Sequence, residues 1–218
     1  MCNLLRYKAE IQEVHGVFQE LSEVRITPKI RFKVAPSETA PVIRLHGGQA
    51  RLGMMAFGWK TARGRQLMAR GETVATLPMF RDGFRFRRCL VIAHGFYDSL
   101  DMGHYRQPWH IHLKSDGVMG LAGLWEERPD GGAFTLVSTR PNAVVARVID
   151  RMPVILPPGA WKPWLDPMTA PESLQSLLVP SPAEEMEAWP VTRQVNQRGF
   201  DSPECIVPVV PEQGELNL

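Results

Sequence analysis

The second residue of the chain is a cysteine, and its position gives it a chemistry that the other cysteines lack. Cys2 becomes the N-terminal residue if Met1 is removed, and only Cys89 and Cys205 complete the cysteine set. An N-terminal cysteine carries an amine and a thiol on adjacent carbons, and because α-amino groups titrate near about 7.7–8.0, a nucleophilic fraction exists at neutral pH. The amine can condense with an aldehyde to a Schiff base, which the thiol closes to a thiazolidine. Alternatively, Cys2 is an acyl-transfer nucleophile with its own amine as base, or a small packing residue.

A second group of titratable residues stands at the end of a strongly apolar stretch. The segment VIAHGFYD places His94, Tyr97 and Asp98 directly after a run of core-type residues. A carboxylate or an imidazole at the end of a buried strand can be tuned by its surroundings for acid–base work. Structural hydrogen bonding is the alternative interpretation.

Two further clusters carry weaker chemical signals. His110 and His112 alternate with apolar residues in PWHIHL, so both face one side of a predicted strand. Zinc sites need a third protein ligand, and because none follows at motif spacing we predict neither a metal site nor a cofactor. Arg151 follows Asp150 before an apolar run, where it either forms a helix-terminal ion pair or contacts a phosphate.

The basic residues are concentrated in one part of the chain. Residues 58–88 contain eight basic and two acidic side chains, a local balance of +6 within a chain of formal net charge +2. Residues 165–188 instead carry five acidic and no basic side chains. This asymmetry indicates a surface that faces a polyanion, although a solvated, salt-bridged face would have the same composition.

The elements that must position these residues are short. Apolar residues recur at helical spacing over residues 7–21, which predicts an amphipathic helix. Residues 84–98 begin with alternating phenylalanines and continue as an apolar run, which predicts a strand entering the core. Further strands are predicted at residues 108–113, 117–126 and 133–140, and helices at 142–150 and 169–178, the last with a capping box.

Hairpins of short strands, rather than alternating strands and helices, organise the chain. We therefore predict the α+β class, with one mixed domain over residues 1–218 in which short antiparallel strands and hairpins form a barrel-like core with peripheral helices. No apolar stretch reaches the about 20 residues of a membrane-spanning helix, and no secretory leader is recognised. Three widely spaced cysteines do not make a disulfide framework. These features predict a soluble, cytoplasmic protein.

Six segments, taken in order, resemble one protein family. They are MC at residues 1–2, VAPSE at 34–38, ARGET at 69–73, RRCLVIAHGFYD at 87–98, NAVVARVIDRMPVIL at 142–156 and PVTRQVNQRGFDSPECIVPV at 190–209. Their combination spans nearly the whole chain and is similar to the SRAP family, which is named for SOS-response-associated peptidase. The resemblance implies a DNA-damage protein that binds single-stranded or branched DNA and captures abasic sites as a thiazolidine on its N-terminal cysteine. It also implies that the first residue is removed autocatalytically or by an aminopeptidase.

The resemblance assigns the chemistry to Cys2 and to a carboxylate that moves protons, here Asp98. Among the departures from the family's pattern, three change site chemistry: the usual glutamate is the shorter Asp98, the usual asparagine is Met68 and the usual histidine is Ile149. A carboxylate that is one methylene shorter slows proton transfer unless the site shifts. Neither Met68 nor Ile149 can transfer a proton, and His94 would be the substitute for the missing imidazole.

The resemblance and the basic run together imply how DNA would be held. The motif match gives a phosphate-binding role to Arg70 and Arg151, and the basic run adds Arg63 and Arg65. Trp59 would offer a base-stacking surface, unless it is a core residue.

Three hypotheses of function remain open at this point. The first is covalent capture of abasic sites, by a protein that associates with the nucleoid when it is bound to DNA. The second is a degenerate module that binds DNA without chemistry, because three site positions are altered. The third is a peptidase or another acyl-directed enzyme that uses the same N-terminal nucleophile.

Overall fold

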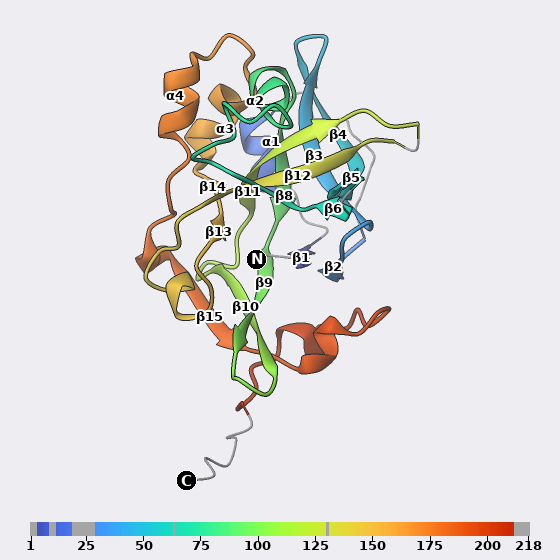
Figure 1. Ribbon diagram of the computed structural model, residues 1–218, viewed down its shortest axis with the longest axis vertical. Coiled ribbons are helices and arrows are strands. Elements are labelled where there is room, and N and C mark those ends of the chain that lie inside the picture. Colours follow the sequence, from blue (N-terminus) through green and yellow to red (C-terminus); the bar gives the residue numbers. More distant parts are fainter. Residues whose placement is uncertain (1–3, 9–11, 19–28, 63, 130, 212–218) are drawn as a thin grey trace.

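One continuous apolar segment passes through two large sheets and sets their arrangement. It forms β8 (Arg88–Ala93) in the first sheet and β9 (Gly95–Asp101) in the second, with His94 at the joint. The computed structural model describes residues 4–8, 12–18, 29–62, 64–129 and 131–211. In Figure 1 the two strands run through the middle of the molecule, from the end with the helices towards the end with the C-terminal segment.

The first sheet closes into a ring. Besides β8 its strands are β3 (Thr39–His46), β4 (Gln49–Phe57), β7 (Met68–Arg70), β11 (Met119–Glu126), β12 (Ala133–Thr139), β13 (Met152–Pro153) and β14 (Ile155–Leu156). The pairing order β12, β4, β3, β8, β11 returns to β12, because β11 also pairs with β12. Most pairs are antiparallel, whereas β12 runs parallel to β4 and to β7. The closed ring confirms the predicted α+β class with a barrel-like core.

The second sheet carries the start of the chain. Besides β9 it contains β1 (Leu4–Tyr7), β2 (Arg31–Val34), β10 (Arg106–Leu113) and β15 (Met186–Pro190), in the order β15-β10-β9-β1-β2. Leu4 pairs with Tyr97 across β1 and β9, so the beginning of β1 lies next to the position of Asp98. A separate hairpin is formed by β5 (Trp59–Thr61) and β6 (Gly64–Gln66).

The helices gather at one end of the molecule (Figure 1). They are α1 (Gln12–Val17), α2 (Arg81–Phe86), α3 (Pro158–Leu165) and α4 (Pro171–Ser176), and single 3-10 turns occur at Val145–Arg147, Ala183–Glu185, Arg193–Asn196 and Pro203–Ile206. Trp161 and Trp164 of α3 are fully buried, and their indole N–H groups donate to the carbonyls of Leu156 and Cys89 at 2.8 and 2.9 Å. These contacts anchor α3 on the outside of the ring.

Both faces of β8 are buried, which explains its unbroken apolar sequence. Leu90 and Ile92 pack in the core that lies under the helices, whereas Cys89, Val91 and Ala93 pack in the core that fills the ring. A strand buried on both faces needs apolar side chains at every position rather than at alternate ones. The predicted core strand is therefore confirmed for residues 88–93.

Three local predictions differ from the structure. The predicted strand does not begin at the phenylalanine pair, because α2 covers Arg81–Phe86 and buries Phe84 against Trp164 while Phe86 stays 62% exposed. The helix predicted at residues 7–21 is shorter in the structure, because Tyr7 belongs to β1 and α1 covers only Gln12–Val17. Residues 9–11 and 19–28 lie outside the described part of the chain. The helix at 142–150 is only one 3-10 turn.

The described helices include none that could cross a bilayer. The longest of them, α3, has eight residues.

Candidate active site

A cleft of about 740 Å³ opens where both sheets and the C-terminal segment meet. Side chains from distant parts of the chain line it: Leu4, Lys33, Ala35, Pro36, Arg65, Gln66, Leu67, Met68, Asp98, Ser99, Arg106, Asn196 and Arg198. Pairing of β1, β2, β9 and β10 in one sheet brings together Leu4, Lys33, Asp98, Ser99 and Arg106. The carboxylate of Asp98 and several cationic side chains line this cleft together.

Asp98 is the carboxylate of this cleft. It lies on β9, is only 4% exposed, and its Oδ1 accepts a hydrogen bond of 2.8 Å from the backbone N–H of Ser99. Across the sheet it faces Trp109 on β10. A carboxylate held this way has one defined orientation, which is what acid–base catalysis requires.

Four cationic side chains line the same cleft as this carboxylate. Lys33, Arg65, Arg106 and Arg198 line the cleft with Asp98, so the formal charge of the lining residues is +3. Arg65 donates to the carbonyl of Gly58 at 2.6 Å and Arg106 to that of Ser99 at 3.0 Å. These bonds orient the guanidinium groups without neutralising them, so the cleft attracts anions.

A second cleft of about 530 Å³ adjoins the first. Gln66 and Met68 line both, and Arg70, Asp150 and Arg151 line only the second. The two clefts therefore share a wall at Gln66 and Met68.

Arg151 is held in this second cleft by an ion pair. Its two terminal nitrogens donate to the two carboxylate oxygens of Glu72 at 2.7 and 2.8 Å, and one of them also donates to the carbonyl of Ser138 at 2.8 Å. The hydrogen bonds from Arg151 hold the pKa of Glu72 below its ordinary value. A phosphate that approached Arg151 would compete with Glu72, whereas Arg70 is exposed.

His94 lies outside both clefts. Its ring Nδ1 accepts a hydrogen bond of 3.0 Å from the backbone N–H of Lys8, and the residue is 3% exposed. Burial, with smaller contributions from Lys8 and Arg6, lowers the pKa of His94 to about 4, so the ring is neutral. His94 lines neither the cleft of Asp98 nor that of Arg151, so its ring does not lie where a substitute for the missing imidazole would act.

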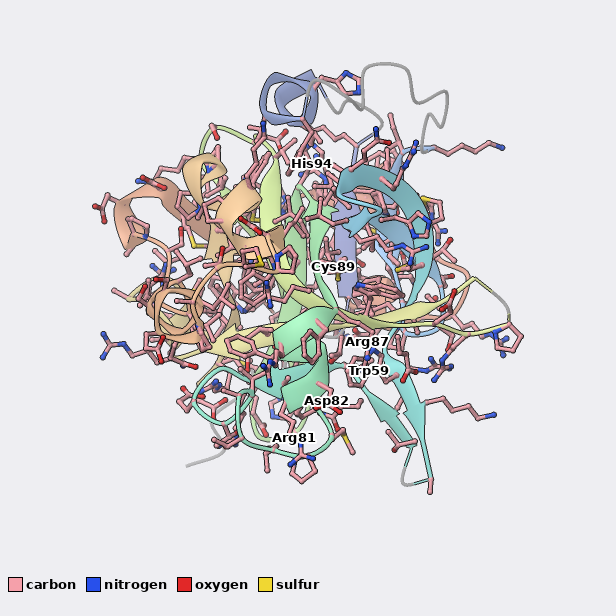
Figure 2. All side chains as sticks on the ribbon, turned by 90° about the horizontal axis from the view of Figure 1, so that it is seen from above. Trp59, Arg81, Asp82, Arg87, Cys89 and His94 are labelled. Carbon is pink, nitrogen blue, oxygen red and sulfur yellow. The ribbon has the colours of Figure 1, made fainter. Side chains whose placement is uncertain are left out.

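Trp59 is a core residue. It is 5% exposed, and its ring packs 5.6 Å from that of Phe80, close to Gly83 of α2. In Figure 2 it lies beside α2, inward of Arg81 and Asp82. Its ring has no open face on which a base can stack in this structure.

The remaining predicted positions are distributed unevenly. Met68 and Arg65 line the cleft of Asp98, whereas Ile149 packs against the core of the ring and lines neither cleft. Cys2 and Arg63 lie outside the described residues.

Sequence reasoning did not assign several residues that the cleft contains. Lys33 immediately precedes the VAPSE segment, and Asn196 and Arg198 stand inside the long C-terminal segment, so the motif blocks had marked their neighbourhood. Arg106 stands outside every such segment, and only strand pairing brings it beside Ser99.

The histidine pair of β10 is buried rather than exposed as a ligand set. The rings of His110 and His112 stack with 4.6 Å between their centroids, and Trp189 packs edge-on against both. Among the described residues, no group of three or more histidine, cysteine, aspartate or glutamate side chains is arranged to hold a metal ion.

Comparison with known proteins gives a consistent family assignment. The family described as SOS response associated peptidase (SRAP) matches residues 1–198. The chain is 35% identical over 211 residues to the abasic site processing protein YoqW of Bacillus subtilis, covering 90% of this chain and 93% of that protein. It is 28% identical over 148 residues to the abasic site processing protein HMCES of Gallus gallus, covering 56% of this chain and 44% of that protein.

Solved structures share the fold. A Bacteroides thetaiotaomicron protein superimposes with a TM-score of 0.77 at 19% identity, over 96% of this chain and all of the other. A phage-related protein of Bordetella bronchiseptica gives a TM-score of 0.73 at 22% identity, over 87% of this chain and 94% of the other.

Proposed function

The chain belongs to the SRAP family, and we propose that it binds single-stranded DNA at abasic sites and captures the lesion covalently through Cys2 after removal of Met1. The curated relatives are named for abasic site processing, which supports the substrate class. The covalent step through Cys2 rests on the chemistry of an N-terminal aminothiol.

The reaction balances without a co-reactant. The free amine of Cys2 adds to the aldehyde carbon of the ring-opened deoxyribose, and loss of water leaves a carbon–nitrogen double bond. The thiol sulfur then adds to that carbon, and its proton goes to the nitrogen, which closes the thiazolidine. Two proton transfers accompany the loss of water, so a carboxylate within reach accelerates the sequence.

The observation that carries the proposal is the position of Asp98. This carboxylate is nearly enclosed in the cleft whose wall includes Leu4, and Leu4 pairs with its neighbour Tyr97. Cys2 precedes Leu4 by two residues, which span at most about 7 Å even when fully extended. Chain length alone therefore keeps the aminothiol within a short distance of the cleft.

The cations of the cleft support a DNA substrate. An abasic site is flanked by phosphates on both sides, and the lining residues, of formal charge +3, offer them partners. In the proposed complex the sugar would lie against Asp98. Such contacts hold the strand without reading its sequence, which suits a lesion that has lost its base.

One denaturing gel tests the proposal directly. The full-length protein, with loss of Met1 checked by intact mass, is mixed with a single-stranded oligonucleotide that carries one abasic site. We expect a band shift that survives denaturation and that disappears in Cys2→Ala. In Asp98→Ala the band should form at least about tenfold more slowly, because the aminothiol remains while the group that moves protons is lost. If Cys2→Ala forms the same band, the proposal is wrong.

A second candidate function follows from Met68. This thioether lines both clefts where the family carries an amide, and it cannot donate or accept as an amide does. A module that binds DNA without chemistry would shift the same oligonucleotide in a native gel and give no band in the denaturing one.

A further inference from the structure

A third groove lies at the helical end of the molecule, between α2 and the connection from α3 to α4. Its volume is about 580 Å³, and none of its lining residues lines the clefts of Asp98 or Arg151. Figure 1 shows α2, α3 and α4 together at this end, opposite the C-terminal segment. The groove is therefore a surface that the proposed DNA chemistry does not use.

The floor of the groove is apolar. Phe84 and Leu174 lie at its base with 3% and 2% exposure, and Pro167 and Pro171 form its walls. Met168 borders it with 86% of its surface exposed, although a thioether side chain usually packs in the interior. Concave apolar surface of this kind is typical of a site that receives a partner's side chain.

The rim and base of the groove are positively charged. Arg81, Arg85 and Arg88 line it and Asp82 is the carboxylate among the lining residues, so their formal charge is +2. Figure 2, which looks down on α2, shows Arg81 and Asp82 towards the edge of the molecule. Arg81 and Arg85 are exposed, so their guanidinium groups can reach a bound anion, which would compete with Asp82 for Arg81, 3.5 Å away.

Arg88 lies under the groove and is hydrogen-bonded to backbone carbonyls rather than to a carboxylate. Its guanidinium donates to the backbone carbonyls of Trp164, Phe84, Arg85 and Asp166 at distances of 2.6 to 2.7 Å. The residue is 5% exposed. Carbonyl oxygens orient the guanidinium, burial lowers its pKa, and the carboxylate of Asp166 partly offsets that effect. The attraction of the groove for an anion therefore comes chiefly from the exposed Arg81 and Arg85.

We propose that this groove binds a short acidic peptide segment of a protein partner, with one apolar side chain in the floor and carboxylates against Arg81 and Arg85. A nucleic acid fits the groove less well, because proteins that bind single-stranded nucleic acid without sequence preference stack its bases on aromatic rings, and the exposed Phe86 of α2 does not line the groove. Phe84, the aromatic residue among the lining side chains, is 3% exposed. The mode is the acidic-motif recognition by clustered arginines that recurs among peptide-binding proteins.

The test uses fluorescence anisotropy with the full-length protein. The probe is a fluorescein-labelled hexapeptide, Asp-Asp-Glu-Leu-Pro-Phe, with a free C-terminal carboxylate. We expect saturable micromolar binding that weakens about tenfold or more in Arg81→Glu/Arg85→Glu and in Met168→Asp, because one variant reverses the rim charge and the other makes the apolar border anionic. All three positions are exposed, so the variants preserve the packing.

The control variant Arg51→Glu/Lys114→Glu makes the same change in net charge at exposed positions that line none of these grooves. It should bind the peptide as the unaltered protein does, and all variants should still form the adduct that depends on Cys2. The proposal is overturned if the peptide does not bind saturably, or if the control loses as much affinity as Arg81→Glu/Arg85→Glu. It is also overturned if an unmodified oligothymidine displaces the peptide and itself depends on Arg81 and Arg85, because the groove would then be a nucleic-acid site.

Discussion

Asp98 and Met68 share one cleft, but the strands that carry them constrain them differently. β9 is an inner strand of its sheet, and Asp98 also accepts a hydrogen bond of 2.8 Å from the backbone N–H of Ser99. Met68 lies on the short strand β7 and borders both clefts. A flexible thioether at this boundary can pack on a bound sugar or on Cys2 but cannot hold it by hydrogen bonds. The chemistry that we propose therefore depends on one carboxylate rather than on a network.

At the residue scale His94 makes a prediction about pH. Its pKa is lowered to about 4 in the folded protein against 6.5 ordinarily, because burial disfavours the charged ring. The unfolded chain therefore binds a proton that the folded one does not, and the stability that His94 contributes is present above pH 6.5 and is lost as the pH falls towards 4. The shift corresponds to about 3 kcal/mol at most.

Urea unfolding at pH 7 and pH 4.5 measures this contribution. In His94→Asn the shorter amide can still accept from the N–H of Lys8, and the free energy of unfolding should fall less between the two pH values than in the unaltered protein. His110 and His112 also have lowered pKa values because of burial, so both proteins retain some pH dependence. An identical fall in both would show that His94 does not contribute.

At the element scale two contacts hold the second sheet in register. Asp201 accepts the backbone N–H groups of Phe32 and Lys33 at 2.8 and 2.9 Å and the Nε–H of Arg31 at 2.5 Å. These bonds attach the C-terminal segment to β2, the edge strand. Lys33 and the C-terminal Arg198 therefore reach the same cleft although they are distant in sequence.

Gly95 provides the second contact, where the ring of His110 on the neighbouring strand β10 lies against β9. A Cβ atom at Gly95 would lie 2.3 Å from Nε2 of His110, a distance that a side chain cannot occupy. Gly95→Ala should lower the free energy of unfolding by about 1–3 kcal/mol, because the ring of His110 must leave its buried position. Thermal or urea unfolding measures the loss.

Gly53→Ala is the matched control for this prediction. Gly53 also lies in a strand, β4, and an added Cβ there meets no atom within 4 Å. We expect a change of less than about 0.5 kcal/mol or a small gain, since alanine restricts the unfolded chain more than glycine does. Equal destabilisation by both substitutions would exclude the close approach as the cause.

At the scale of the whole molecule, the cationic side chains gather at two separate sites. The cleft of Asp98 gathers cations from β2, β6, β10 and the C-terminal segment, and the third groove gathers cations around α2 at the helical end. The basic run of residues 58–88 contributes to both, because its members lie on different elements. The composition indicated one surface that faces a polyanion, whereas the structure divides these cations between two separate sites.

The cleft cations predict a salt dependence of DNA binding. In a Cys2→Ala background, which isolates the non-covalent step, the logarithm of affinity for a single-stranded oligonucleotide should fall linearly with the logarithm of salt concentration. Adding Arg106→Gln and Arg198→Gln should reduce the slope by about 1.4, since each phosphate contact on a single strand contributes about 0.7. Both residues are exposed, so their removal leaves the core intact.

Anisotropy titrations at four salt concentrations give these slopes. The pair Arg51→Gln and Lys114→Gln removes the same charge from exposed positions outside the cleft and should leave the slope nearly unchanged. Equal slopes in all three proteins would mean that phosphates do not occupy this cleft.

The sequence by itself determined the strand that carries Asp98, the fold class and the family. The apolar run of β8, the strands near 108–113, 117–126 and 133–140 and the six segments are local patterns, and local patterns are written directly in the order of residues. The sequence did not predict helix α2, because two alternating phenylalanines are too few to distinguish the period of a strand from that of a helix.

Only the tertiary structure decided which side chains share the cleft. Lys33, Arg106 and Arg198 converge there through strand pairing, whereas Trp59 is enclosed by Phe80 and α2, and His94 turns to Lys8. Burial and convergence depend on which distant segments pair and in what register, and a shift of one residue would turn each side chain to the opposite face. That information belongs to the packed chain, because no single segment contains both partners of any of these contacts.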